Sequence, residues 1–216
     1  MKRIAIAVVC LVLLSTFTFA AEMPKADTKA ATTAAHQDKK FLLNYLKQTR
    51  QDFLKSISGL SEAQWNYKAS PERWSIAECA EHITLAENFI RDAYAKTMKE
   101  PSASDEQKAK ANIPDEKLIA MLTDRSQKFK APEPIQPKTH QWTTPRALGR
   151  EFYKRRDETI RIAKSTPDSE LRGHVADSPV GAPLNGYQFL ELIAAHSKRH
   201  TLQIEEVKSD PNYPKK

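Results

Sequence analysis

The sequence predicts an all-α fold, a four-helix bundle with a long crossover between its second and third helices. Four segments place apolar residues at spacings of three and four, which forms one apolar face on a helix. No segment shows the sustained alternation of a half-buried strand, and no repeat of fixed period is present. Bundles of this class accommodate long connections between helices.

Residues 1–20 predict export. Lys2 and Arg3 form a charged start, Ile4 to Phe17 form an apolar core, and Thr18-Phe19-Ala20 is a small-residue cleavage site. The apolar core is shorter than the roughly 20 residues that a membrane helix needs. We therefore expect a signal peptide cut after Ala20, a periplasmic or secreted protein, and no stable membrane span after cleavage. An uncleaved membrane anchor is the alternative.

Charge and cysteine content limit the function classes. Without Lys2 and Arg3 the chain has 32 basic and 27 acidic residues, a formal charge of +5. This charge is mild and dispersed, so the sequence does not predict nucleic-acid binding. Cys79 is the one cysteine of the expected mature chain, so that chain cannot form an internal disulfide, and burial of its core must stabilise the protein.

One bundle domain is expected over residues 41–208. Residues 21–40 are rich in Ala, Thr, Lys and Asp and lack an apolar period, so they are predicted to form a flexible tether. The first helix of the bundle starts at Phe41 and continues to Ile57, and Gly59 ends it.

The second helix has the clearest start. Ser75 followed by Glu78 is a capping box, and Trp74 before it can pack on Cys79 as a hydrophobic staple. The helix is predicted from Ile76 to about Met98.

The remaining helices follow a proline-rich connection. Residues 100–146 contain six prolines around one amphipathic piece, Asp115 to Lys130, which predicts a crossover with an embedded helix. A third helix is predicted from Pro145 to Lys164. After a loop rich in glycine and proline, the last helix carries its apolar face from Phe189 to Val207.

Charged residues of these helices are expected at the surface. Glu81, Glu87 and Arg91 lie off the apolar stripe of the second helix. Arg155 and Arg156 flank the inward side of the third helix and are interpreted as solvated side chains that snorkel from the bundle. Their alternative role is to hold a substrate carboxylate or phosphate.

Three histidines lie on apolar helix faces. His196 and His200 are four residues apart, so their imidazoles lie on one side of the last helix. The intervening Ser197-Lys198-Arg199 lacks the glutamate of the HExxH proteases, which excludes that class. His82 lies on the inward stripe of the second helix, so three imidazoles are predicted to converge on a divalent metal with an open coordination position.

Two alternatives for these residues stay open. Each histidine can instead be a core residue with its own hydrogen-bond partners. Cys79, one turn before His82, can be a fourth ligand or a nucleophile, although a small core residue is the commoner role of such a cysteine.

The segment Arg73-Trp74-Ser75-Ile76-Ala77-Glu78-Cys79-Ala80-Glu81-His82-Ile83 resembles the second-helix motif of DinB-like (DinB/YfiT-like) proteins. The paired histidines of the last helix match as well, and the resemblance spans about residues 40–208. It implies that His82, His196 and His200 bind a divalent metal. Relatives include thiol transferases that use bacillithiol, mycothiol or glutathione, and a mycothiol-dependent isomerase. The export signal and the proline-rich crossover depart from the family pattern.

Taken together, the sequence predicts an exported metalloprotein. Zinc is the favoured ion, with nickel, iron or manganese as alternatives. The expected activity is a metal-dependent thiol transfer or hydrolysis on a small electrophile. A non-catalytic bundle that binds metal or a small ligand is the alternative, and a purely structural bundle is a third hypothesis. The sequence is also compatible with a homodimer that forms through exposed helix faces.

Overall fold

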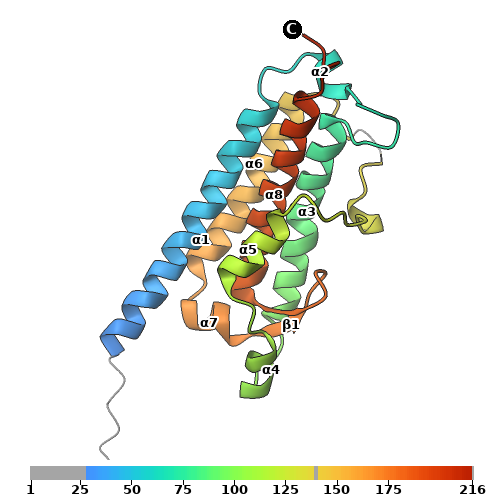
Figure 1. Cartoon of the computed structure of the whole chain (residues 1–216). Helices are drawn as coiled ribbons and strands as arrows, with labels where there is room; N and C mark the ends of the chain where they lie inside the picture. Colours follow the sequence, from blue (N-terminus) through green and yellow to red (C-terminus); the bar gives the residue numbers. More distant parts are fainter. Residues whose placement is uncertain (1–27, 139–140, 216) are drawn as a thin grey trace, which may run out of the picture.

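Four long helices form the bundle, and each contains one of the four segments with helical apolar periodicity. The computed structural model describes residues 28–138 and 141–215, and its long helices are α1 (Thr28–Ile57), α3 (Ile76–Thr97), α6 (Pro145–Ser165) and α8 (Gly186–Lys208) (Figure 1). Helix α8 packs against both α1 and α3, and α6 packs against the same two helices. The predicted four-helix bundle is confirmed.

Shorter elements connect the long helices. Helix α2 (Glu62–Asn66) lies between α1 and α3. The crossover contains α4 (Asp105–Lys110), α5 (Asp115–Thr123) and the short 3-10 helix η1 (Glu133–Ile135). Helix α7 (Asp168–Gly173) and the strands β1 (Val175–Asp177) and β2 (Pro183–Asn185) precede α8.

The two helices that carry the histidines both start at capping boxes. In α3 the Ser75 hydroxyl accepts from the Glu78 amide at 3.1 Å, and the Glu78 carboxylate accepts from the Ser75 amide at 2.6 Å. This box was predicted. In α8 the Asn185 and Gln188 side chains make the same reciprocal pair of bonds, at 3.0 and 3.2 Å. Each box satisfies backbone amides that lack helical partners, which fixes where the helix begins.

Helix α1 begins earlier than the apolar pattern does. The expected tether is wrong for residues 28–40, which are helical, whereas residues 1–27 lie outside the described residues. The alanine-rich composition explains the difference, because alanine has the highest helix propensity and a packed helix extends cooperatively. Part of this added length is held to α8, because the Tyr187 hydroxyl donates a hydrogen bond to the Asp38 carbonyl at 2.8 Å.

The crossover lies against α3 and α8. Helix α5 packs on α8, and η1 packs on α3. The predicted helix from Asp115 to Lys130 is too long, because α5 ends at Thr123. The Asp124 carboxylate accepts from the amide and the hydroxyl of Ser126, both at 2.9 Å, and this local turn competes with continued helix.

A small hairpin leads into α8. Strands β1 and β2 pair antiparallel with Val175 opposite Asn185. Gly181 in the connecting turn has a φ of +80°, which a side chain would strain. Strands of three residues are too short to show alternation in the sequence, so the pattern did not predict them.

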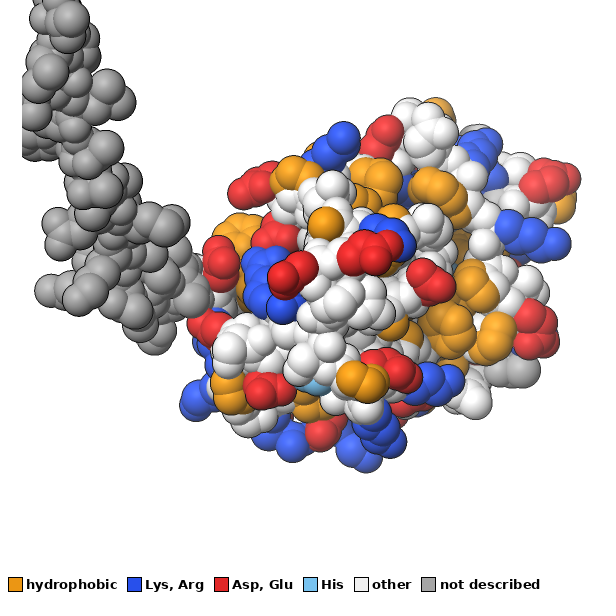
Figure 2. Space-filling view, turned by 90° about the horizontal axis from the view of Figure 1, so that it is seen from below, with side chains coloured by type: hydrophobic (Ala, Val, Ile, Leu, Met, Phe, Trp, Pro, Cys, Tyr) orange, Lys and Arg blue, Asp and Glu red, His pale blue; other side chains and the backbone are white. Residues whose placement is uncertain are grey.

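The surface of the bundle is mixed in character. Acidic, basic and apolar side chains are interspersed on the face seen from below in Figure 2. Within residues 28–138 and 141–215, no helix has both the length and the hydropathy that crossing a membrane requires.

The core consists of two apolar clusters that follow one another along the bundle. One cluster includes the buried Trp65 of α2 together with Phe53 and Phe152. The two phenyl rings pack edge to face with their centroids 4.4 Å apart. The other includes Leu46 and Phe189. The two clusters are joined by buried polar side chains that occupy positions between them on all four long helices.

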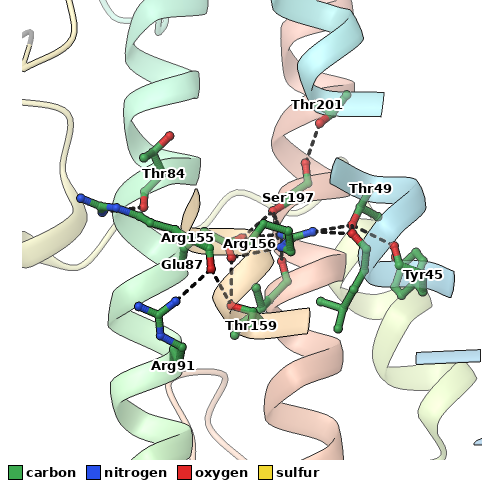
Figure 3. A network of polar contacts seen from close by, with 12 residues as sticks. Tyr45, Thr49, Thr84, Glu87, Arg91, Arg155, Arg156, Thr159, Ser197 and Thr201 are labelled. Carbon is green, nitrogen blue, oxygen red and sulfur yellow. Dashed lines mark hydrogen bonds and ion pairs between the residues drawn. The ribbon is translucent and has the colours of Figure 1, made fainter. Parts of the chain in front are cut away.

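Arg156 is the centre of this polar layer (Figure 3). Its guanidinium donates to both Glu87 carboxylate oxygens, to the Leu46 carbonyl at 3.0 Å, to the Thr49 hydroxyl at 2.8 Å and to the Ser197 hydroxyl at 2.6 Å. These partners lie on α3, α1 and α8, whereas Arg156 belongs to α6. One side chain therefore connects the four helices of the bundle.

The expectation that these charges are solvated is wrong for three of them. Arg156 is fully buried, and Glu81 and Glu87 of α3 are buried as well. Arg91 and Arg155 are half-buried. Helical periodicity identifies the apolar stripe, but a charged residue beside that stripe is enclosed when an opposite charge faces it from another helix.

Replacement of Arg156 by Met is expected to destabilise the protein by about 3–5 kcal/mol, because Glu87 then stays buried without its cation. The free energy of unfolding is measured by urea denaturation with circular dichroism. Arg161→Met is the control, because Arg161 is exposed on the same helix and pairs with Asp157 and Glu158. It should cost less than about 0.5 kcal/mol. Equal losses in the two variants would contradict the central role of Arg156.

Glu191 on α8 is a further buried acidic residue, and the sequence analysis did not single it out. The side chain is fully buried, and neither carboxylate oxygen has a hydrogen-bond partner in the described structure. Burial, helped by repulsion from Asp115, raises the pKa of Glu191 to about 8. The carboxyl group is therefore mainly protonated at neutral pH.

Glu191→Gln is expected to flatten the pH dependence of stability. The unfolded carboxyl releases its proton near pH 4.5, but the folded one keeps it until about pH 8, so wild-type stability falls as the pH rises between these values. The wild type should lose about 2–4 kcal/mol more than the variant between pH 5 and pH 8. Urea denaturation at both pH values measures this, and the exposed Glu205→Gln is the control. Parallel pH profiles for wild type and Glu191→Gln would refute the raised pKa.

Candidate metal centre

The structure brings together the three predicted histidines. His82 on α3 meets His196 and His200 on α8 because these two helices lie side by side (Figure 1). The ring centroids are 4.8 Å apart for His82 and His196, 4.5 Å for His82 and His200, and 4.6 Å for the pair on α8. One potential ligand atom from each ring lies within 4.8 Å of the others. Among the described residues, the group that can hold a metal consists of these three side chains.

Two of the rings are oriented by hydrogen bonds through Nδ1. His82 Nδ1 lies 2.7 Å from the Ile135 carbonyl oxygen, and His200 Nδ1 lies 2.8 Å from the Gln203 side-chain oxygen. Because a carbonyl oxygen only accepts, both Nδ1 atoms carry the proton, and both Nε2 atoms present a lone pair. Metal-binding histidines usually have such a partner on the second nitrogen, which fixes the tautomer.

The spacing of the nitrogens fits a shared ion. His196 Nε2 and His82 Nε2 are 3.0 Å apart. Two imidazole nitrogens on one zinc ion, at the usual ~2.0–2.1 Å, lie about 3.3 Å apart in tetrahedral geometry. The donor set is therefore suited to zinc and to the other divalent ions that prefer imidazole.

The imidazoles are neutral at physiological pH. Burial lowers the pKa of His82 to about 4. Burial and the neighbouring imidazoles hold the pKa of His196 and of His200 well below the usual value. His82 is buried, and the other two residues are half-buried, so the cluster lies near the edge of the bundle interior. Neutral nitrogens bind a cation without first releasing a proton.

Trp74 forms one wall of the cluster. Its ring centroid lies 4.9 Å from that of His82, and it stacks on His200 at 6.1 Å with an interplanar angle of 29°. The sequence placed this residue as a staple over Cys79, and it packs against the apolar cluster that contains Cys79. Its contacts with the two histidine rings were not predicted.

Cys79 does not join the metal-binding group. The thiol is fully buried, and burial raises its pKa well above the ordinary range, so it stays protonated. Cys79 lies outside the group of side chains whose ligand atoms converge, and a protonated thiol in a packed core is a poor nucleophile. Of the alternatives for Cys79, the structure supports the small core residue.

Sequence reasoning missed Gln203, which lies one turn from His200, and two contributors that involve the crossover. The Ile135 carbonyl reaches His82 from the crossover, 53 residues away along the chain. Arg199, noted only as a residue between the paired histidines, binds crossover carbonyls. No local sequence pattern predicts which backbone carbonyl of a distant segment will contact a side chain. The contacts of Arg199 and Ile135 therefore could not be predicted from the sequence.

The fold and the cluster define a class of protein, a four-helix bundle with an interior three-histidine group suited to a divalent metal. The sequence matches the model of the DinB superfamily over residues 45–204, and the chain belongs to this superfamily. The predicted resemblance to DinB-like proteins is thereby confirmed.

Two proteins of Bacillus subtilis are similar to this chain. YuaE of strain 168, described as uncharacterised, is 27% identical over 166 residues, which covers 77% of this chain and 96% of YuaE. The structure of YfiT aligns with a TM-score of 0.56 and 12% identity, over 82% of this chain and 89% of YfiT. YfiT is described as "a probable metal-dependent hydrolase with an unusual four-helix bundle topology". At this identity the likeness establishes the fold alone.

Metal affinity of the cluster is expected to change little with pH. Three imidazoles of ordinary pKa, about 6.5, would lose about a thousandfold in affinity between pH 7.5 and 5.5. The lowered pKa values predict a loss of less than about threefold for the folded protein. Zinc dissociation constants from competition with a chromophoric chelator measure this, and a peptide with three exposed histidines is the reference. A thousandfold loss in the protein would show that its histidines titrate normally.

Proposed function

We propose that this protein is an exported, metal-dependent hydrolase that acts on a small electrophile, with zinc as the favoured ion. The observation that carries the proposal is the convergence of three neutral imidazoles, two of them held by Nδ1 hydrogen bonds that leave Nε2 unprotonated. Three protein ligands leave coordination positions for water and substrate, as in catalytic zinc sites. The description of YfiT supports the same reaction class.

The residues around the cluster define what each part contributes. Ile135 and Gln203 orient His82 and His200, and the Trp74 ring covers one side. When bound, a divalent ion supplies Lewis-acid activation of the nucleophile and the electrophile. Because the Cys79 thiol stays protonated in the core, it is not the attacking group in this proposal, and water takes that role.

Thiol transfer is the second candidate, because several thiol transferases belong to the family that this chain resembles. It requires a low-molecular-weight thiol in the compartment where the protein works. Hydrolysis requires only water. The proposed export through residues 1–20 therefore favours hydrolysis over thiol transfer.

The metal site is tested by elemental analysis of untagged protein after incubation with zinc and desalting. The wild type should retain about one equivalent of zinc, and the His82→Ala, His196→Ala, His200→Ala triple variant should retain none. His174→Ala is the control, because His174 is also buried but bonds to Glu100 and Glu170 and does not belong to the three-histidine group. Equal zinc contents in the wild type and the triple variant would refute the proposed metal site.

Hydrolysis is tested on the same proteins with panels of small esters and amides. Zinc-loaded wild type is expected to release product from at least one panel member, with turnover lost in His82→Ala and retained in His174→Ala. Turnover that appears only when bacillithiol, mycothiol or glutathione is added would favour the thiol transferase. A zinc-loaded protein that is inactive in both assays would favour the non-catalytic metal-binding bundle.

A further inference from the structure

Arg199 connects the metal-binding helix to the crossover. It lies on α8 between His196 and His200 and is buried. Its guanidinium donates to the backbone carbonyls of Leu122, at 3.2 Å, of Asp124 and of Gln127. A buried arginine whose hydrogen bonds go to another segment's backbone holds that segment in place.

The contact closes the end of α5. Leu122 lies in the last turn of α5, and Asp124 follows its last residue, Thr123. Carbonyls at a helix C-terminus lack partners within the helix, and a cation there is favourable. Arg199 therefore caps α5 and at the same time fixes the turn that follows, up to Gln127.

The other end of the same segment reaches the metal centre directly. We name residues 122–135 the crossover strap. The strap ends at the buried Ile135, whose carbonyl oxygen lies 2.7 Å from His82 Nδ1. The Arg125 guanidinium donates two hydrogen bonds to the Glu206 carboxylate of α8, at 3.0 and 2.9 Å. The strap is thus attached to α8 at its start and to a metal-binding histidine at its end.

We propose that Arg199 is a positioning residue for the three-histidine cluster. It holds the crossover strap where the Ile135 carbonyl orients His82, so that order in the strap and metal binding stabilise each other. Such coupling is reciprocal: a strap held in place strengthens metal binding, and a bound metal slows opening of the strap. The inference rests on the proposed metal binding, and Arg199 is not one of the three side chains that could hold the metal.

The first test compares zinc affinities of folded proteins. Arg199→Gln is expected to weaken zinc binding by about tenfold or more, as loss of a group that orients a ligand does. Lys198→Gln is the matched control, because it removes the same charge from the neighbouring position of α8. It should keep the wild-type dissociation constant within about twofold. An unchanged dissociation constant in a folded Arg199→Gln protein would overturn the proposal.

The second test follows tryptic cleavage after Lys128 and Lys130, both within the crossover strap. Free zinc at about one hundred times its dissociation constant should slow cleavage of the wild type up to about a hundredfold, because opening releases His82 from its partner. Lys198→Gln should show the same protection. Arg199→Gln should be cleaved faster without zinc and protected less with it. Zinc that leaves wild-type cleavage unchanged, with trypsin activity verified on a small substrate, would count against the coupling.

The outcomes separate this inference from the proposed function. A wild type that binds no zinc refutes the metal site itself. A wild type that binds zinc, with neither affinity nor cleavage affected by Arg199→Gln, refutes only the role of Arg199. If Arg199→Gln does not fold, Arg199→Lys carries the test, since lysine keeps the charge but lacks the planar fork for several carbonyls. Intermediate affinity and partial protection are expected for it, and wild-type values in both assays would reject the proposal.

Discussion

The bundle depends on the buried contact between Arg156 and Glu87. Two charges withdrawn from water are tolerated only when their hydrogen-bonding capacity is met, and here the guanidinium also binds groups on α1 and α8. The contact lies between the two apolar clusters of the core. It gives the helices a common register that apolar packing alone, which is non-directional, specifies less strictly.

That common register also affects the three-histidine cluster. Glu87 is five residues beyond His82 on α3, and Ser197 directly follows His196 on α8. The polar layer therefore fixes the relative position of the same two helices that supply the imidazoles. A site made from side chains of facing helices is only as well defined as the packing of those helices.

The crossover contributes to the three-histidine cluster as well as connecting α3 to α6. A connection of this length contributes little to a generic four-helix core, yet here it supplies a carbonyl to His82 and receives the guanidinium of Arg199. Its proline content restricts the backbone between these attachments, so less conformational freedom is lost when the segment is ordered. The chain belongs to the DinB superfamily, and its four long helices form the bundle, whereas the orientation of His82 depends on the crossover.

The sequence by itself determined the four long helices, the capping box at Ser75 and the faces on which His82, His196 and His200 lie, because these follow from periodicity and from contacts within a few residues. The tertiary structure decided the rest. Whether Glu87 and Arg156 are solvated or paired, where α5 ends and which carbonyl orients His82 depend on segments that lie far apart in the chain. Local propensity carries no information about such partners. The helical start at Thr28 was missed for a related reason, since an apolar period reports packing, and a helix can extend beyond the residues that pack.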